Sequence, residues 1–219
     1  MRQPPRRPGS LSLPRLYAIV DVEACARAGR APLDVTRALL SAGVRCLQLR
    51  AKPWGSGAML DLAQAMVADA AAAGAVVIIN DRVDVAAIAG AHGVHVGQDD
   101  LPPAEARRIV GEPSILGFST HTAAQLLEGL AEPVSYLAVG PVFGTGTKAT
   151  GYEAIGLEAV ERAAAIVMPQ AIPLVAIGGI TLDRAPMVIA AGATSVAVIS
   201  DLLAGDPEAR ARAFLRALA

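Results

Sequence analysis

The sequence is poor in aromatic residues, which make up 3% of its 219 positions, although hydrophobic residues make up 53%. The hydrophobic side chains are therefore mostly those of Ala, Val, Leu and Ile. A core of many small side chains lets elements approach closely, as helices do when they pack on a sheet. At about 100 to 200 residues per domain, the length suits one large domain or two small ones.

The chain also lacks a surplus of charge. Its 19 Lys and Arg residues and 20 Asp and Glu residues give a formal net charge of −1. Such a weak field argues against nucleic acid or an anionic membrane as a partner. No apolar run approaches the ~18 residues of a membrane-spanning helix. Aspartates at positions 61, 69, 81 and 84 interrupt the most apolar stretch. We therefore expect a soluble protein.

Cysteine is scarce as well. Cys25 and Cys46 form neither a CxxC pair nor a metal-type spacing, and we expect two buried, reduced thiols in a non-secreted chain. The segment from Met1 to Arg15 is rich in Arg and Pro and holds no apolar block of the length that a secretory signal needs. We predict a disordered tail over residues 1–15, a catalytic domain over residues 16–219 and a cytoplasmic location.

What the sequence does have is a regular alternation of two kinds of segment. Short runs rich in Val, Ile and Leu predict eight strands. These runs are 16–20, 46–50, 76–80, 94–97, 115–119, 136–140, 174–178 and 195–200. Amphipathic segments between them predict helices. The segments are 34–42, 59–73, 83–89, 103–110, 123–131, 157–167 and 184–191.

Strands that alternate with helices predict a parallel sheet with right-handed crossovers. Eight such units can close into a single (β/α)8 TIM barrel, for which about 200 residues is near the lower limit. The alternative is an open doubly wound sheet, which usually has a glycine-rich turn after its first strand. Asp21, Val22 and Glu23 follow the first run here. We therefore predict the barrel.

The strand around residues 47–52 carries polar side chains at alternate positions. Gln48, Arg50 and Lys52 share one face, and Leu47, Leu49 and Ala51 share the other. If the leucines meet the helices, the polar set points into the mouth of the barrel, where active sites of this fold lie. Two cations there need an anion, which favours a site for a polyanionic group. The alternative is ion pairs with carboxylates of the barrel.

Acidic residues follow the next two predicted strands. Asp81 comes directly after the third, and Asp99 and Asp100 come shortly after the fourth. Adjacent parallel strands deliver these side chains to neighbouring parts of one rim. Mg²⁺ usually takes one or two protein carboxylates and fills its octahedron with water and phosphate oxygens, so we predict an Mg²⁺ site. The alternative is helix capping by Asp81 and Asp84, which we accept for Asp84.

Glycine-rich segments follow the last three predicted strands. Residues 140–151 carry several hydroxyls and one lysine, Lys148. We interpret this segment as a lid that closes on an anion, with a flexible surface loop as the alternative. Gly178 to Thr181 and Ile199 with Ser200 follow the seventh and eighth strands. Barrels commonly hold a substrate phosphate there, which predicts a second anion site.

Six motifs, in order, resemble thiamine phosphate synthase and together span nearly all of residues 16–203. They are LQLRAK at 47–52, IND at 79–81, GVHVGQDD at 93–100, GFSTHT at 117–122, GPVFGTGTK at 140–148 and VAIGGI at 175–180. The resemblance implies a transferase that joins hydroxymethylpyrimidine diphosphate to hydroxyethylthiazole phosphate and releases pyrophosphate. It also implies Mg²⁺ as the cofactor and these two small molecules as the partners.

The resemblance assigns the following roles. It implies that the pyrimidine diphosphate is held by Arg50 and Lys52, with Gln48 and Asn80 beside them, and that Asp81 and Asp100 bind Mg²⁺. Ser119 and Lys148 would contact the pyrimidine substrate or its leaving group, and are expected to be catalytic together with Arg50 and Lys52. The thiazole phosphate would be held by Thr145, Thr147, Gly179, Ile199 and Ser200.

The sequence departs from the family pattern in places. Ala51 stands where the family often has Glu, and Gly144 and Gly146 enrich the loop in glycine. One alternative function is a related thiazole tautomerase with His121 as the acid or base, since a neutral imidazole moves protons near pH 7. That enzyme need not bind a diphosphate. Another alternative is a non-catalytic barrel that senses or carries a phosphorylated metabolite. We predict structural roles for His92 and His95, with a hydrogen bond donated by His95 near the metal rim as the alternative for that residue. The oligomeric state stays open, a homo-oligomer included.

Overall fold

Eight parallel strands close into a barrel in which each strand pairs with its neighbours in the chain and β8 pairs with β1. The computed structural model describes residues 12–144 and 152–219. The strands are β1 (Leu16–Asp21), β2 (Cys46–Arg50), β3 (Val76–Asn80), β4 (Gly93–Val96), β5 (Ile115–Thr120), β6 (Tyr136–Val139), β7 (Leu174–Ile177) and β8 (Ser195–Val198). This confirms the predicted (β/α)8 barrel.

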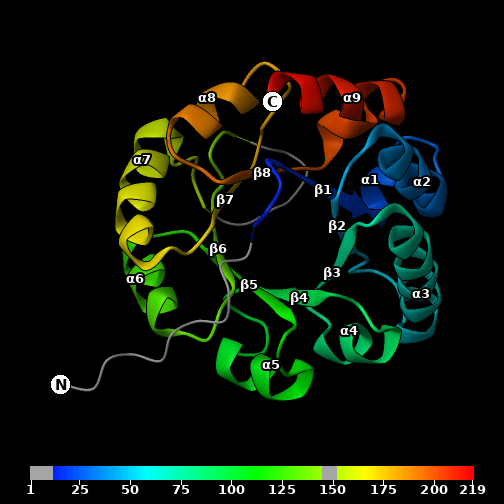
Figure 1. Ribbon diagram of the computed structural model, residues 1–219, viewed down its shortest axis with the longest axis horizontal. Coiled ribbons are helices and arrows are strands. Elements are labelled where there is room, and N and C mark those ends of the chain that lie inside the picture. Colours follow the sequence, from blue (N-terminus) through cyan, green and yellow to red (C-terminus); the bar gives the residue numbers. More distant parts are fainter. Residues whose placement is uncertain (1–11, 145–151) are drawn as a thin grey trace.

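Helices form a ring around the strands (Figure 1). They are α1 (Val22–Arg27), α2 (Pro32–Ala42), α3 (Ser56–Ala73), α4 (Val83–Ala89), α5 (Pro103–Val110), α6 (Ala123–Ala131), α7 (Gly156–Val167), α8 (Ala185–Ala190) and α9 (Pro207–Ala217), with two short 3₁₀ helices, η1 (Met168–Gln170) and η2 (Ser200–Leu203). Each predicted helical segment corresponds to one of these helices. Two helices, α1 and α9, fall outside the prediction.

The two missed helices have weak sequence signals for different reasons. α1 has six residues and begins directly at the end of β1, where the Asp21 carboxylate accepts a hydrogen bond from the Ala24 N–H at 2.7 Å. α9 is polar apart from a narrow stripe that includes the buried residues Pro207, Ala211 and Phe214. It packs on α2 and so covers the seam of the ring between the last and first units.

Buried side chains form two layers. The larger layer lies between the strands and the helices and includes Leu47 and Leu49 of β2. The smaller layer fills the barrel interior and includes Tyr17, Cys46 and Tyr136. Successive residues of β2 therefore alternate between the layers, which is the alternation that the sequence predicts for this strand.

The predicted tail over residues 1–15 lies mostly outside the described residues. Of its last four residues, Leu13 is buried and packs in the inner layer beside Tyr17 and Ile19. The chain therefore contributes to the barrel core from Leu13 onward. None of the helices in the described part of the chain is both long and apolar enough to cross a membrane.

Candidate active site

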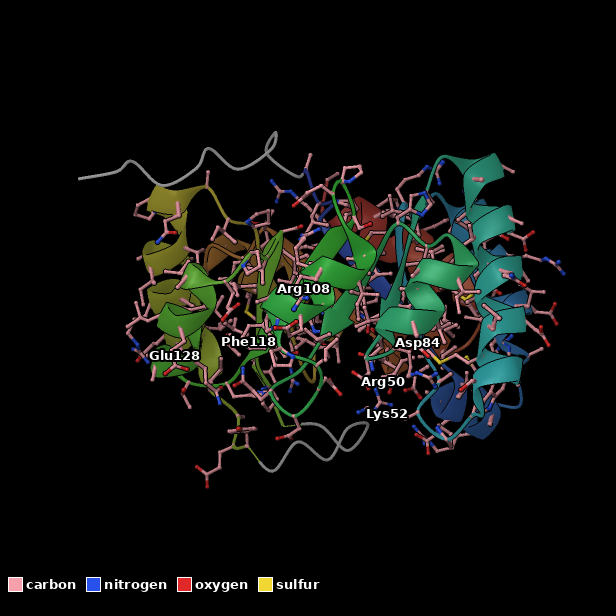
Figure 2. All side chains as sticks on the ribbon, turned by 90° about the horizontal axis from the view of Figure 1, so that it is seen from below. Arg50, Lys52, Asp84, Arg108, Phe118 and Glu128 are labelled. Atoms are coloured by element: carbon pink, nitrogen blue, oxygen red, sulfur yellow. The ribbon has the colours of Figure 1, made fainter. Side chains whose placement is uncertain are left out.

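Polar side chains gather where β1 to β4 end. Figure 2 shows Arg50 and Lys52 close together at the end of the barrel that is lowest in that view. Gln48 and Arg50 are buried, although neither belongs to the outer apolar layer that holds Leu47 and Leu49. Gln48 and Arg50 also line a small cavity of about 20 Å³ inside the barrel. The polar face of β2 therefore points inward, as predicted.

Both cations are engaged by carboxylates. Arg50 Nη1 forms a buried ion pair with Asp21, the last residue of β1, and lies 3.9 Å from Glu23. Lys52 Nζ lies 2.8 Å from Asp81. The ion pairs that the sequence left as an alternative are thus present. Arg50 Nε, however, is buried without a hydrogen-bond partner among the described residues, so the guanidinium keeps a donor for an anion.

Asp81 and Asp100 lie next to each other at this rim. Asp81 has a φ of +64°, a left-handed conformation that Asp tolerates better than most residues. Burial raises the pKa of Asp81, while the hydrogen bond from Lys52 lowers it and the neighbouring Asp100 raises it again. Asp100 also accepts a hydrogen bond from the Gly97 N–H at 2.7 Å.

This pair of carboxylates suits a hard divalent cation that brings its own further ligands. The structure holds no third His, Cys, Asp or Glu that completes a metal cluster within the described residues. Mg²⁺ needs only one or two protein carboxylates when phosphate oxygens and water complete its shell, so the donor set fits. Asp99 is exposed, and Asp84 binds Arg82 at 2.5 Å. Neither of them joins the pair.

A hydrogen-bonded chain of side chains crosses the barrel interior, and sequence reasoning missed it. Gln48 Nε2 lies 2.8 Å from Tyr17 Oη, which lies 3.0 Å from Tyr136 Oη. Tyr136 Oη lies 2.9 Å from His95 Nδ1, and His95 Nε2 lies 2.8 Å from Ser119 Oγ. The strands β1, β2, β4, β5 and β6 supply these five residues. Alternation would have placed each of them inside the barrel, but a parallel strand pattern does not tell which inward side chains touch.

A cavity of about 370 Å³ opens between the ends of β5 to β8. Its lining includes Ser119 and His121 on one side and Gly178, Gly179, Ile199 and Ser200 on the other. The predicted residues Gly179, Ile199 and Ser200 are thus brought together. Thr145, Thr147 and Lys148, with the rest of the interpreted lid up to residue 151, lie outside the described residues.

The turn after β7 depends on its two glycines. Gly178 and Gly179 have φ values of +103° and +60°. A Cβ on Gly178 would lie 2.5 Å from the Pro141 side chain, and one on Gly179 would lie 2.6 Å from the Gly144 carbonyl oxygen. Only glycine allows this close approach, so the turn that lines the cavity carries no side chains at these two positions.

Two cavity residues carry a charge or a titratable ring that the sequence did not place. Arg184 stacks over the Phe143 ring at 4.5 Å and donates from Nη1 to the Gly179 carbonyl at 2.9 Å. His121 Nδ1 donates to the Gly140 carbonyl at 2.6 Å, and its ring stacks on Tyr152 with centroids 4.0 Å apart. His92 has a structural role, because its Nδ1 accepts the Val77 N–H at 3.1 Å.

The departures from the family pattern do not disturb the charged rim. Ala51 is buried in the outer layer, away from the polar face of β2. Gly144 is exposed at the edge of the cavity, and Gly146 lies outside the described residues.

A parallel barrel with a cation and carboxylate cluster on one side of its mouth and a backbone-lined cavity on the other is typical of enzymes that act on phosphorylated small molecules. The family model described as thiamine monophosphate synthase matches residues 16–202. The chain belongs to this family.

Individual relatives agree. A thiamine-phosphate synthase of Koribacter versatilis is 44% identical over 213 residues, which cover 95% of this chain and 97% of the relative. One from Thermus thermophilus is 44% identical over 205 residues, covering 92% and 95%. Among solved structures, a thiamine phosphate pyrophosphorylase from Pyrococcus furiosus is similar with a TM-score of 0.83 and 30% identity, covering 93% of this chain and 95% of that one.

Proposed function

We propose that this protein joins hydroxymethylpyrimidine diphosphate to hydroxyethylthiazole phosphate, giving thiamine phosphate and pyrophosphate. The observation that carries the proposal is the division of the barrel mouth into a charged side and a larger cavity that meet at Ser119. The inner cavity below the charged side and the larger cavity are both lined by this residue. Membership in the thiamine monophosphate synthase family supports the same activity.

The diphosphate belongs on the charged side. Arg50 is fixed by Asp21 and offers its buried Nε, and Lys52 is half-exposed, so both can turn donors toward phosphate oxygens. Charge-assisted hydrogen bonds to the departing group strengthen as its negative charge grows. Gln48 and Asn80 line the inner cavity beside Arg50, which fits the role of neighbours to this site.

Asp81 and Asp100 would hold Mg²⁺. When bound, this ion supplies positive charge that stabilises the pyrophosphate as it leaves. Lys52 would then exchange part of its contact with Asp81 for the substrate. Lys52 would therefore be bound to Asp81 alone in the free protein and to both Asp81 and the diphosphate in the complex.

The thiazole phosphate belongs on the opposite side, against the turn at Gly178 and Gly179 and the segment at Ile199 and Ser200. Thr145, Thr147 and Lys148 remain predicted contributors. In the reaction the carbon–oxygen bond to the diphosphate breaks and its electron pair leaves with pyrophosphate. The thiazole nitrogen then forms the new carbon–nitrogen bond. The apolar lining contributed by Pro141, Ile177 and Ile180 keeps water from competing for the pyrimidine cation.

The thiazole tautomerase alternative would use His121, which does line the cavity. A tautomerase that binds no diphosphate would not need the buried donor of Arg50 or the pair formed by Asp81 and Asp100. The geometry therefore favours the synthase. The cytoplasmic location stays a prediction from the sequence, and the oligomeric state stays open.

The test is a coupling assay with both substrates and Mg²⁺, followed by detection of thiamine phosphate and pyrophosphate. Titration calorimetry of each substrate separates the two sites. We expect Asp81→Asn to abolish coupling while the affinity for thiazole phosphate changes less than about threefold, because distant sites contribute nearly independently. Wild-type protein that binds thiazole phosphate but shows no affinity for the pyrimidine diphosphate with Mg²⁺ would contradict the proposal.

A further inference from the structure

The buried hydrogen bonds that link Gln48 to Ser119 can be assigned one common direction from donor to acceptor. An amide nitrogen can only donate, so Gln48 Nε2 donates to Tyr17 Oη at 2.8 Å. The Tyr17 and Tyr136 hydroxyls lie 3.0 Å apart, and because Tyr17 already accepts from Gln48 we assign Tyr17 as the donor to Tyr136. In this assignment each hydroxyl accepts one hydrogen bond and donates another to the next residue.

The same direction continues through the imidazole. Tyr136 Oη lies 2.9 Å from His95 Nδ1, and His95 Nε2 lies 2.8 Å from Ser119 Oγ. With Tyr136 as the donor, Nδ1 is the acceptor, so the same assignment places the ring proton on Nε2, as the donor to Ser119. Burial raises the pKa of both phenols above the usual value for tyrosine, so both remain O–H donors at neutral pH.

The packing holds this chain in place. Tyr17, Tyr136 and Gln48 are at most 4% exposed, and His95 and Ser119 are each 8% exposed. The imidazole stacks on the Tyr136 ring, with centroids 5.5 Å apart and an interplanar angle of 20°. Gly117 of β5 makes room for the contact, because a Cβ there would lie 2.3 Å from Tyr136 Oη and 2.5 Å from His95 Nδ1.

We propose that Gln48, Tyr17, Tyr136 and His95 are positioning residues that make Ser119 a hydrogen-bond donor whose proton points into the mouth of the barrel. Ser119 lines both the inner cavity and the larger cavity, so its hydroxyl is the end of the chain that a substrate can reach. Resting on the proposed function, the acceptor is an atom of the pyrimidine diphosphate. No proton is transferred; the hydroxyl is only oriented.

The direction of these hydrogen bonds can be measured in the protein without substrate. Imidazole ¹⁵N spectra of histidine-labelled protein distinguish the two neutral tautomers, and three histidines allow assignment by single substitution. We expect His95 to carry its proton on Nε2. Tyr136→Phe removes the donor to Nδ1, so we expect the proton to shift toward Nδ1. Tyr152→Phe is the matched control, since it removes a tyrosine hydroxyl outside the chain and should leave the His95 signals unchanged.

Steady-state kinetics test whether the direction of these hydrogen bonds affects catalysis. We expect Tyr136→Phe to lower kcat/KM for the pyrimidine diphosphate about tenfold, the effect of one hydrogen bond of roughly 1.4 kcal/mol. The calorimetric Kd of thiazole phosphate should stay within about twofold, because Tyr136 does not line the larger cavity to which that ligand is assigned. Tyr17→Phe, one link further away, should have the smaller effect on kcat/KM.

Substitutions at His95 give a second route if Tyr136→Phe does not fold. The amide of His95→Gln can place an N–H donor near the position of Nε2, whereas that of His95→Asn reaches only the position of Nδ1. We expect Gln to retain more of the wild-type kcat/KM than Asn. A wild-type ring protonated on Nδ1 or on both nitrogens would overturn the proposal. So would equal activity of the Gln and Asn variants, or an unchanged kcat/KM in folded Tyr136→Phe. Failure of the wild type to make thiamine phosphate would overturn the proposed function instead, since the tautomer is measured without substrate.

Discussion

We expect the two sides of the barrel mouth to bind anions by different means. On the side of β1 to β4, each of the two cations already faces a carboxylate, Arg50 facing Asp21 and Lys52 facing Asp81. On the side of β5 to β8, the site is a cavity of about 370 Å³ whose lining combines glycines, apolar side chains and the charged residues Arg184 and Asp201. The charges of the first side are paired with one another, whereas the second, open side is a larger and more apolar cavity.

This difference suggests how the enzyme keeps its two phosphorylated substrates apart. A monophosphate on the charged side would have to compete with carboxylates for the cations. Its own charge is too small to compensate for the ion pairs that would break. A diphosphate with Mg²⁺ brings enough charge of both signs to satisfy the cations and the carboxylates together. Under the proposed function, the open side would accept the monophosphate instead.

The largest effect is expected on the charged side, from Arg50→Gln. Asp21, whose side chain is 1% exposed, would lose its counter-ion. Removing one partner of a buried pair costs about 3 to 5 kcal/mol, so the free energy of unfolding should fall by roughly that amount. The loss of charge-assisted hydrogen bonds to the diphosphate should lower kcat/KM about a hundredfold. Urea denaturation and steady-state kinetics measure the two effects.

The double variant Asp21→Asn with Arg50→Gln separates stability from catalysis. Asn keeps an oxygen for the Ala24 N–H but no longer needs a cation. We expect most of the lost stability to return while kcat/KM stays low. If activity returned along with stability, Arg50 would be only a structural counter-ion and the charged side would not be the diphosphate site.

A smaller but still large effect is expected from Asp100→Asn. An amide keeps a possible bond to the Gly97 N–H but halves the negative charge offered by Asp81 and Asp100. The Mg²⁺ concentration for half-maximal activity should rise at least about tenfold, roughly 1.4 kcal/mol of metal affinity. EDTA should abolish wild-type turnover, and added Mg²⁺ should restore it. Full activity of the wild type in EDTA would contradict the metal assignment.

On the open side, Gly179→Ala should weaken binding without changing the chemistry. The new Cβ would lie 2.6 Å from the Gly144 oxygen and 2.8 Å from Phe143 Cβ, so the turn must shift. We expect KM for the thiazole phosphate to rise about tenfold, the loss of roughly one hydrogen bond, while kcat at saturation holds. Gly90→Ala is the matched control, because Gly90 has a similar φ of +65° and its Cβ would meet nothing within 4 Å. If both variants raised KM equally, backbone strain and not the site would be the cause.

The two sides also differ in how far the sequence revealed them. Arg50, Lys52 and Asp81 could be placed at the mouth, because charged residues at the ends of apolar strands are unusual and strand alternation fixes the face of Arg50 and Lys52. The choice of Asp100 over Asp99 came from the resemblance to the family. The partner of Arg50 could not, since Asp21 ends a different strand and only barrel closure and register bring the two together. The open side depends on backbone conformation, which glycine permits but does not specify.

The inner hydrogen-bonded chain marks the limit of sequence reasoning in this barrel. Tyr17, His95 and Tyr136 each read as an inward residue of a separate strand. Their contacts arise from the pairing of His95 with Gly117 and of Gly117 with Tyr136 across three strands. Sequence analysis therefore predicted a structural role for His95, whereas the structure places it between Tyr136 and the expected catalytic residue Ser119.

The smallest effect is expected from Cys46→Ala, which tests how depth along one strand face separates packing from chemistry. Cys46 shares its face of β2 with Gln48 and Arg50 but is 0% exposed, packs in the inner apolar layer and lies at the opposite end of the strand from the mouth. Burial raises the pKa of this thiol, so it stays protonated and takes no part in proton or metal chemistry. Removing the sulfur should cost about 1 kcal/mol of packing and leave kcat/KM within about twofold. Urea denaturation would show whether the variant is folded. If folded Cys46→Ala lost as much turnover as Arg50→Gln, packing in the interior layer would affect the charged side. The two sides of the mouth would then not be independent.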